Sequence, residues 1–208
     1  MTAAPVPVSR LERAALADLF EELGPDRPTC CEGWTTRDLA AHLVVRDRRP
    51  DAMPGLVLGG PFAAWTARVQ AAAGARSFAA LVAAVRSGPP VWLPGAWPAV
   101  DQLTNTAELV IHHEDVRRAQ PGWSPRPLPR STQDRLWSTV PLLARGHESS
   151  PTPGGLVVQR TDVPASSLES GRRLRNGTPT TRVAGEPLEV LLWVSGRREV
   201  AHVEVTTA

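Results

Sequence analysis

Apolar residues recur three and four positions apart through most of the first 120 residues, which is the spacing of amphipathic helices. Gly24 and Pro25 end the first such segment. Its apolar face is expected to comprise Leu11, Ala14, Ala15, Leu19 and Leu23. Together, these intervals predict helices over residues 9–23, 36–49, 62–74, 77–88 and 101–119.

The second predicted helix has a defined beginning and end. Thr35 stands three residues before Asp38, which is the arrangement of a capping box, and Pro50 prevents the helix from continuing. We therefore place this helix between Thr35 and Pro50, after a polar turn over residues 25–34.

The pattern changes after a Pro-rich stretch over residues 120–131, beyond which one more helix is predicted from Ser131 to Gly146. Residues with strand character then alternate with a short helix opened by Pro187. The predicted strands are 154–162, 180–186 and 199–207. The sequence thus predicts a mostly α-helical protein with a small α/β C-terminal part. We expect a helical bundle in residues 1–120, a Pro-rich linker and helix in residues 121–150, and a small α/β domain in residues 151–208.

Composition supports a globular protein in a reducing compartment. Of 208 residues, 42% are hydrophobic, enough for a core, and no apolar run approaches the roughly 18 residues of a membrane span. The first residues do not resemble a secretory signal, so we expect a cytoplasmic location. The neighbouring Cys30 and Cys31 offer no disulfide framework, and we leave open whether they are ligands, reactive thiols or packing residues.

Charge argues against a nucleic-acid partner. The formal net charge is +2, and acidic and basic residues are interleaved along the chain instead of forming a basic stripe that could follow phosphates. The sequence also lacks a Gly-x-Ser-x-Gly elbow, a phosphate-binding glycine loop and a dinucleotide fingerprint. We therefore expect neither nucleic-acid binding nor a hydrolase, kinase or dehydrogenase function, and the sequence leaves the oligomeric state open.

The helix predicted over residues 101–119 has acidic and imidazole side chains on its apolar face. Glu108, His112 and Asp115 share this face with Ile111 and Val116 because residues three and four apart lie together on a helix. Burying an ionised carboxylate is costly unless it is paired or bound to a metal. Glu108 therefore needs a partner.

A metal ion is one such partner. Glu108 and His112, with His42 from the second helix, would supply three ligands and leave the fourth position of a tetrahedral zinc site open. Asp38 and Asp115 each lie one turn from a candidate ligand and are predicted to accept the free ring N–H of an imidazole.

Other readings of the same residues remain open. His42 and His112 could be ordinary core histidines, with Glu108 paired to Arg46 or Arg117. His113 points away from the apolar face and is expected near the site without binding metal, or at the surface.

Three segments carry a resemblance to a known family. Residues 33–51 and 105–123 resemble the mycothiol-dependent maleylpyruvate isomerase family, and most closely its uncharacterised metal-binding subgroup. Residues 185–205 are similar to that family's small C-terminal domain. The resemblance implies a DinB-like four-helix bundle that holds a divalent metal, usually zinc, through one His on the second helix and a Glu-x-x-x-His on the fourth. These roles would fall on His42, Glu108 and His112.

The resemblance also implies a chemistry in which the metal activates the thiol of mycothiol. We expect an enzyme that isomerises a small acid or transfers the thiol to an electrophile, with Arg46, Arg117 or Arg118 holding carboxylates. The alternatives are a non-catalytic metal- or ligand-binding protein and a purely structural bundle. The sequence departs from the family in its short length and in "HHEDVRRA" around the second histidine.

Overall fold

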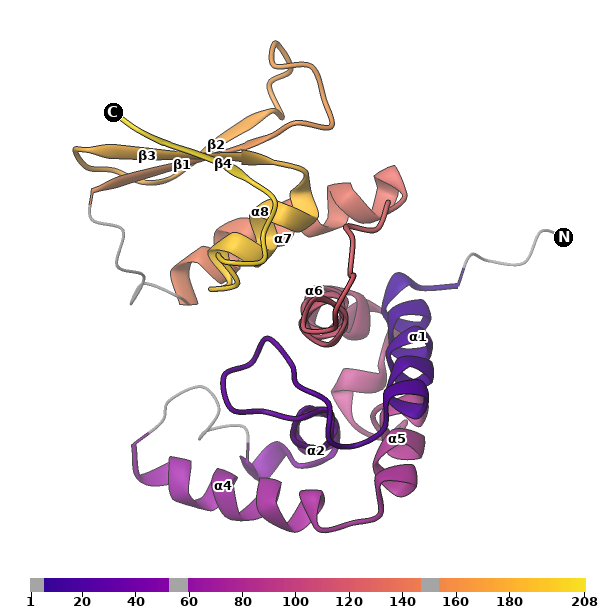
Figure 1. The fold of residues 1–208 in the computed structure, drawn as a ribbon. Helices are drawn as coiled ribbons and strands as arrows, with labels where there is room; N and C mark the ends of the chain where they lie inside the picture. The colour runs from indigo at the N-terminus through magenta and orange to yellow at the C-terminus, as the bar shows by residue number, and fades with distance from the viewer. Residues whose placement is uncertain (1–5, 53–59, 147–153) are drawn as a thin grey trace, which may run out of the picture. The chain divides into compact units, whose positions relative to one another are not determined.

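The chain folds into two compact units, residues 1–123 and 124–208. The computed structural model describes residues 6–52, 60–146 and 154–208. Its helices and its small sheet confirm the predicted fold class, which is mostly helical with a small α/β part (Figure 1).

The first unit is a bundle of helices. Its α-helices are α1 (Val8–Leu23), α2 (Thr36–Arg48), α4 (Pro61–Gly74), α5 (Phe78–Ser87) and α6 (Pro98–Arg118), with short 3-10 helices η1 (Pro50–Ala52) and η2 (Pro94–Ala96). Helix α1 packs along α6 and α5, and α2 packs on α4 and α5 (Figure 1). Their shared core contains Phe20, Leu39, Leu43, Leu81 and Leu109.

Helix α1 forms as predicted, but it buries a different face from the one expected. Leu11 is 55% exposed, whereas Leu16 and Phe20 are fully buried. The reason is tertiary: Arg13 and Glu12 also point inward, where Arg13 pairs with Asp47 of α2 and Glu12 with His113 of α6. Polar groups with buried partners can occupy an inward face that periodicity alone assigns to apolar residues.

The capping box of α2 is present as predicted. The side chain of Thr35 accepts a hydrogen bond from the backbone of Asp38, and Asp38 Oδ2 accepts one from Thr35 N at 2.9 Å. Helix α2 ends at Arg48, before Pro50. Both ends of the helix that carries His42 are therefore set by local sequence.

The second unit packs two helices beside a four-stranded sheet. It contains α7 (Arg130–Gly146), β1 (Gly155–Arg160), β2 (Gly171–Arg175), β3 (Thr180–Gly185), α8 (Pro187–Val194) and β4 (Glu204–Thr207). The strand order is β2-β1-β3-β4, with β1 and β3 parallel and the outer pairs antiparallel. Helix α8 crosses between β3 and β4, contacts β1 and β3, and packs against α7 on one face of the sheet (Figure 1).

Two strands differ from the prediction. Strand β2 was not predicted, because "GRRLR" has three arginines and no apolar alternation. Strand β4 begins at Glu204 instead of residue 199, and all four of its residues are exposed. Both are edge strands, for which backbone pairing to a neighbour matters more than an apolar face.

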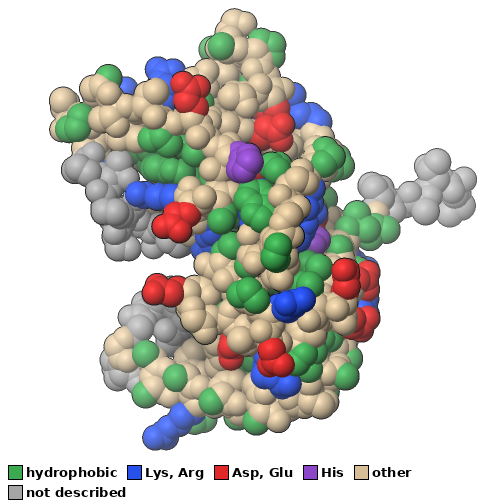
Figure 2. Space-filling view, viewed as in Figure 1, with side chains coloured by type: hydrophobic (Ala, Val, Ile, Leu, Met, Phe, Trp, Pro, Cys, Tyr) green, Lys and Arg blue, Asp and Glu red, His purple; other side chains and the backbone are tan. Residues whose placement is uncertain are grey.

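The molecular surface is consistent with the mixed charge of the sequence. Figure 2 shows acidic and basic side chains interleaved over the face in view. Within the ranges that the structure describes, no helix is both long and apolar enough to cross a bilayer.

Candidate metal centre

Helices α2 and α6 bring three ligand atoms to one place. His42 lies on α2 between the buried Leu39 and Leu43, and Glu108 and His112 lie one turn apart on α6. Glu108 Oε1 is 3.2 Å from Nε2 of His112 and 3.7 Å from Nε2 of His42. All three ligand atoms lie within 4.8 Å of one another. One carboxylate and two imidazoles thus converge without a ligand from the loops.

Burial and mutual contacts shift the pKa values of the three groups. Burial favours the neutral form of Glu108, but hydrogen bonds from His112 and His42 outweigh it and hold the Glu108 pKa well below its usual range. Burial lowers the pKa of His42, against the opposing effect of Glu108. Burial also acts to lower the pKa of His112, but hydrogen bonds with Asp115, Cys31 and Glu108 raise it well above its usual range. The site therefore holds an ionised carboxylate and, at His42, a neutral imidazole.

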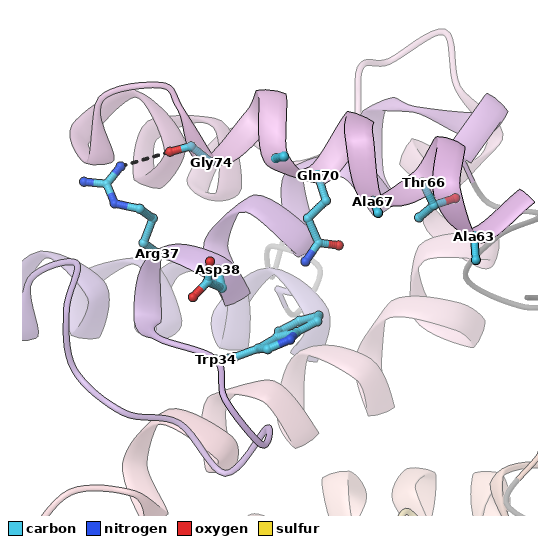
Figure 3. A pocket seen from close by; sticks show the side chains of 9 residues that line it. Trp34, Arg37, Asp38, Ala63, Thr66, Ala67, Gln70 and Gly74 are labelled. Atoms are coloured by element: carbon cyan, nitrogen blue, oxygen red, sulfur yellow. Dashed lines mark hydrogen bonds between the residues drawn. The ribbon is translucent and has the colours of Figure 1, made fainter.

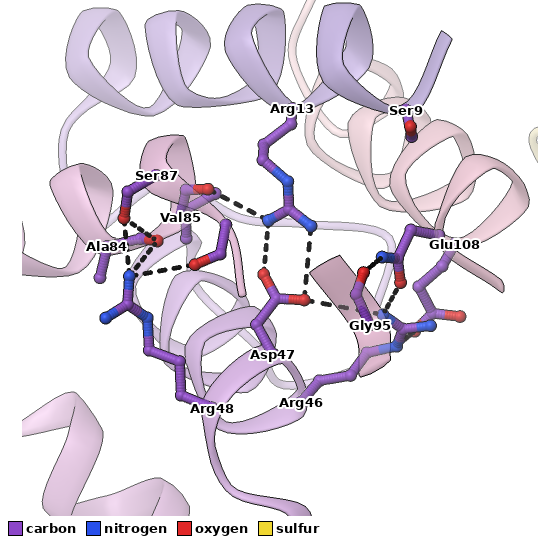
Figure 4. Close-up of polar contacts among 12 residues, drawn as sticks. Ser9, Arg13, Arg46, Asp47, Arg48, Ala84, Val85, Ser87, Gly95 and Glu108 are labelled. Atoms are coloured by element: carbon purple, nitrogen blue, oxygen red, sulfur yellow. Dashed lines mark hydrogen bonds and ion pairs between the residues drawn. The ribbon is translucent and has the colours of Figure 1, made fainter. Parts of the chain in front are cut away.

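Arg46 lies beside the carboxylate. Its Nε is 3.3 Å from Glu108 Oε1, and its Nη1 donates a hydrogen bond to Asn105 Oδ1 at 2.5 Å. Asn105 in turn donates to Asp101 and to the carbonyl of Gly95. Figure 4 shows the Arg46 side chain reaching toward Glu108 and Gly95. The interpretation without a metal expects Glu108 to pair with an arginine, and the ion pair between Glu108 and Arg46 is present. It lies beside the three converging ligand atoms.

The loop before α2 contacts α6 beside His112. Asp115 Oδ2 lies 2.9 Å from His112 Nδ1, and Sγ of Cys31 donates to the same oxygen at 3.3 Å. The backbone N–H of Cys30 donates to the carbonyl of Asp115 at 2.9 Å, which ties the loop to the helix. Sequence reasoning left the role of Cys31 open, because no local spacing relates this loop to α6.

Trp34, from the same loop, contacts His42 and also lines a cavity. Its indole packs against the His42 ring with 5.2 Å between ring centroids. It also lines a cavity of about 550 Å³ between α2 and α4, together with Arg37, Asp38 and Gln70 and a wall of small residues on α4 (Figure 3). None of the three candidate ligands lines this cavity.

Asp38 does not occupy the position predicted for it. Its carboxylate is engaged with Thr35 at the start of α2, instead of accepting from the His42 ring. Nδ1 of His42 is buried and has no hydrogen-bond partner among the described residues. The capping box thus prevails over the expected contact between side chains one turn apart.

Three further predicted residues lie apart from the ligands. His113 points to α1, where its Nδ1 lies 2.8 Å from Glu12. Arg117 and Arg118 both bind the fully buried Glu114, and Arg118 also stacks on Trp123 with its side chain fully buried. Of the three predicted arginines, Arg46 contacts a candidate ligand, whereas Arg117 and Arg118 pair with Glu114.

Comparisons with known proteins bear on the bundle and on the whole fold. Residues 9–55, which include nearly all of α1 and the whole of α2 with His42, match a family described as mycothiol maleylpyruvate isomerase N-terminal domain. No curated protein matches the chain at a significant level.

Two solved structures have a similar fold. One is the crystal structure of a mycothiol-dependent maleylpyruvate isomerase, with a TM-score of 0.61 and 18% identity over 97% of this chain and 90% of that chain. The other is a histidine-to-alanine variant of a mycothiol-dependent maleylpyruvate isomerase, with a TM-score of 0.61 and 17% identity over the same shares. At these identities the likeness shows the fold, and it confirms the predicted DinB-like bundle followed by a small α/β part.

Proposed function

Because this chain belongs, through residues 9–55, to the mycothiol maleylpyruvate isomerase N-terminal domain family, we propose that it is a metal- and thiol-dependent enzyme acting on a small molecule. The reaction we propose is isomerisation of a small acid or transfer of the thiol to an electrophile. The observation that carries the proposal is the convergence of His42, Glu108 and His112 within 4.8 Å.

The donor set fits a divalent metal, with zinc the expected ion. Two imidazole nitrogens and one carboxylate oxygen are ligands that zinc accepts, and three protein ligands leave a position for an exchangeable group. When bound, such a metal lowers the pKa of a coordinated thiol, so that the nucleophilic thiolate is present at neutral pH.

Neighbouring side chains would prepare this site for a thiol and its substrate. Asp115 accepts from Nδ1–H of His112 and so holds the ring with Nε2 toward Glu108, where a metal would bind. Arg46, held by Asn105 beside Glu108, would bind a carboxylate of the thiol or of the substrate. Trp34 packs against the His42 ring and so helps to hold its orientation.

A second candidate function is non-catalytic binding of a metal or ligand. The observation that favours it is that the cavity beside α4 contains none of the three candidate ligands. A binding protein could keep the helical site without giving a substrate access to it.

Cobalt substitution separates the two candidates. We expect Co²⁺-loaded protein to show an absorption spectrum that changes when mycothiol is added, because a thiolate replaces an oxygen ligand. The Cys31→Ser variant should be used, since Sγ of Cys31 lies close enough to His112 to produce a thiolate signal of its own. Conversion of maleylpyruvate by the same sample would support catalysis. A spectrum indifferent to millimolar thiol would favour the binding protein.

The two aspartates next to the imidazoles should behave differently. Asp115→Asn should weaken metal binding by roughly ten- to hundredfold, because it removes the charge that accepts the His112 ring N–H. Asp38→Asn should leave metal affinity nearly unchanged and instead destabilise α2, since Asp38 belongs to the capping box. Metal titration and thermal unfolding of both variants would test this, and an equal loss of affinity in both would contradict it.

A further inference from the structure

A second group of potential ligand atoms lies around Nδ1 of His112, the ring nitrogen that does not face Glu108. Sγ of Cys31, a ring nitrogen of His112 and a carboxylate oxygen of Asp115 lie within 4.8 Å of one another. Asp115 Oδ2 is 2.9 Å from Nδ1 of His112 and 3.3 Å from Sγ of Cys31. Nε2 of the same ring faces Glu108 instead. Each nitrogen of His112 therefore belongs to a different group of ligands.

We propose that Cys31, His112 Nδ1 and Asp115 form a second metal site, which takes a thiophilic divalent cation such as Zn²⁺ or Cd²⁺. Thiolate, imidazole and carboxylate are all zinc ligands, and a thiolate selects softer ions over Mg²⁺, Ca²⁺ and Mn²⁺. Ligand atoms around a tetrahedral zinc are roughly 3.3–3.6 Å apart for ordinary bond lengths. The hydrogen-bonded atoms observed here need to separate by only a few tenths of an ångström.

Protons now occupy the place that the cation would take. The thiol of Cys31 and Nδ1–H of His112 both donate to Asp115 Oδ2. When a cation binds at Nδ1, the Cys31 thiol and the Nδ1–H group each lose a proton to solvent, and His112 keeps its proton at Nε2. Glu108 Oε1, 3.2 Å from Nε2, accepts the hydrogen bond from this Nε2–H.

The two sites are therefore alternatives governed by the tautomer of His112. A metal at Nε2 requires Nδ1–H, which Asp115 accepts; a metal at Nδ1 requires Nε2–H, which Glu108 accepts. One neutral imidazole has one N–H and one lone pair, so it serves one site at a time.

Burial agrees with a site of this kind. Asp115 is fully buried and His112 is only 7% exposed, while Cys31 is half-buried and gives a cation access from the loop. A buried carboxylate requires a partner, and a metal meets that requirement as well as hydrogen bonds do. The backbone bond from Cys30 to the Asp115 carbonyl keeps the loop, and hence Cys31, against α6.

Cadmium titration of the His42→Ala variant tests the proposal, because this variant lacks one ligand of the first site and keeps all three of the second. We expect about one Cd²⁺ per chain, with an ultraviolet charge-transfer band from cadmium-bound thiolate. Adding Cys31→Ser should abolish the band and weaken binding by more than about 100-fold, beyond the usual effect of groups outside the first coordination shell. Adding Cys30→Ser instead should leave both unchanged.

A second variant covers the case in which His42→Ala does not fold. Glu108→Gln keeps an oxygen that accepts from Nε2–H but weakens the first site, and it should show the same band. A band that requires both His42 and Cys31 would place the sulfur at the first site and overturn the proposal. A band that depends on Cys30, or the absence of any band in freshly reduced protein, would also overturn it. No thiol or substrate is present, so this test is independent of the proposed enzymatic function.

Discussion

Replacing His42, Glu108 or His112 with Ala should each abolish tight binding of a divalent metal at the site between α2 and α6. Each residue supplies one of the three ligand atoms that converge there among the described residues, so the loss should exceed the roughly 100-fold upper range for groups outside the first coordination shell. Competition with a chromophoric chelator would measure the affinity. The substitutions should be made in the Cys31→Ser variant, where the thiolate site cannot retain the metal.

His113→Ala provides a matched control. His113 is also buried on α6 and follows His112 directly, but it points to Glu12 of α1. This variant should keep its metal affinity while losing some stability, because Glu12 loses its imidazole partner. Full retention of metal by all three ligand variants would contradict the assignment, as would a loss in His113→Ala equal to that in His112→Ala.

Glu114→Ala should destabilise the first unit by about 3–5 kcal/mol, the usual cost of removing one partner of a buried ion pair. Glu114 is fully buried, and its carboxylate accepts from Nε of Arg118 at 2.6 Å and from Nη1 of Arg117 at 3.0 Å. Without Glu114, the buried guanidinium of Arg118 loses its carboxylate. Denaturant unfolding of metal-free protein would measure the change, since bound metal would add its own stabilisation.

Asp18→Ala is the control for this prediction. Asp18 also pairs with an arginine, Arg86, at 2.6 Å, but its side chain is 68% exposed. Exposed pairs contribute little, so the free energy of unfolding should change by no more than about 1 kcal/mol. Similar changes in Glu114→Ala and Asp18→Ala would show that burial of the pair is not the deciding factor.

The sequence by itself determined the features that depend on near neighbours. The helices of the first unit, the capping box of Thr35 and the helix opened by Pro187 are all present as predicted. The shared face of Glu108, His112 and Asp115 belongs to the same class, because helical geometry relates residues three and four apart wherever the helix packs. Such features depend mainly on residues within a few positions along the chain, so they can be predicted without knowledge of the tertiary packing.

Where the same spacing suits two different local contacts, the sequence could not determine which contact forms. Asp38 stands one turn before His42, a spacing that suits an imidazole contact, but it also suits the capping box, and the structure has the cap. The buried face of α1 is a similar case: its inward Arg13 and Glu12 depend on partners on α2 and α6 that no spacing within α1 reveals. Strand β2 depends in the same way on pairing with β1.

Only the tertiary structure decided which distant residues meet at the candidate site. Glu108 gains His42 and Arg46 from α2, and His112 and Asp115 gain Cys31 from the loop before it, through the packing of separate segments. The pattern of the second helix offered His42 as a partner and the family resemblance supported it, whereas the sequence left the role of Cys31 open. The physical reason is that periodicity specifies which face a residue occupies, while contacts between faces depend on how helices and loops pack together to bury their apolar surface.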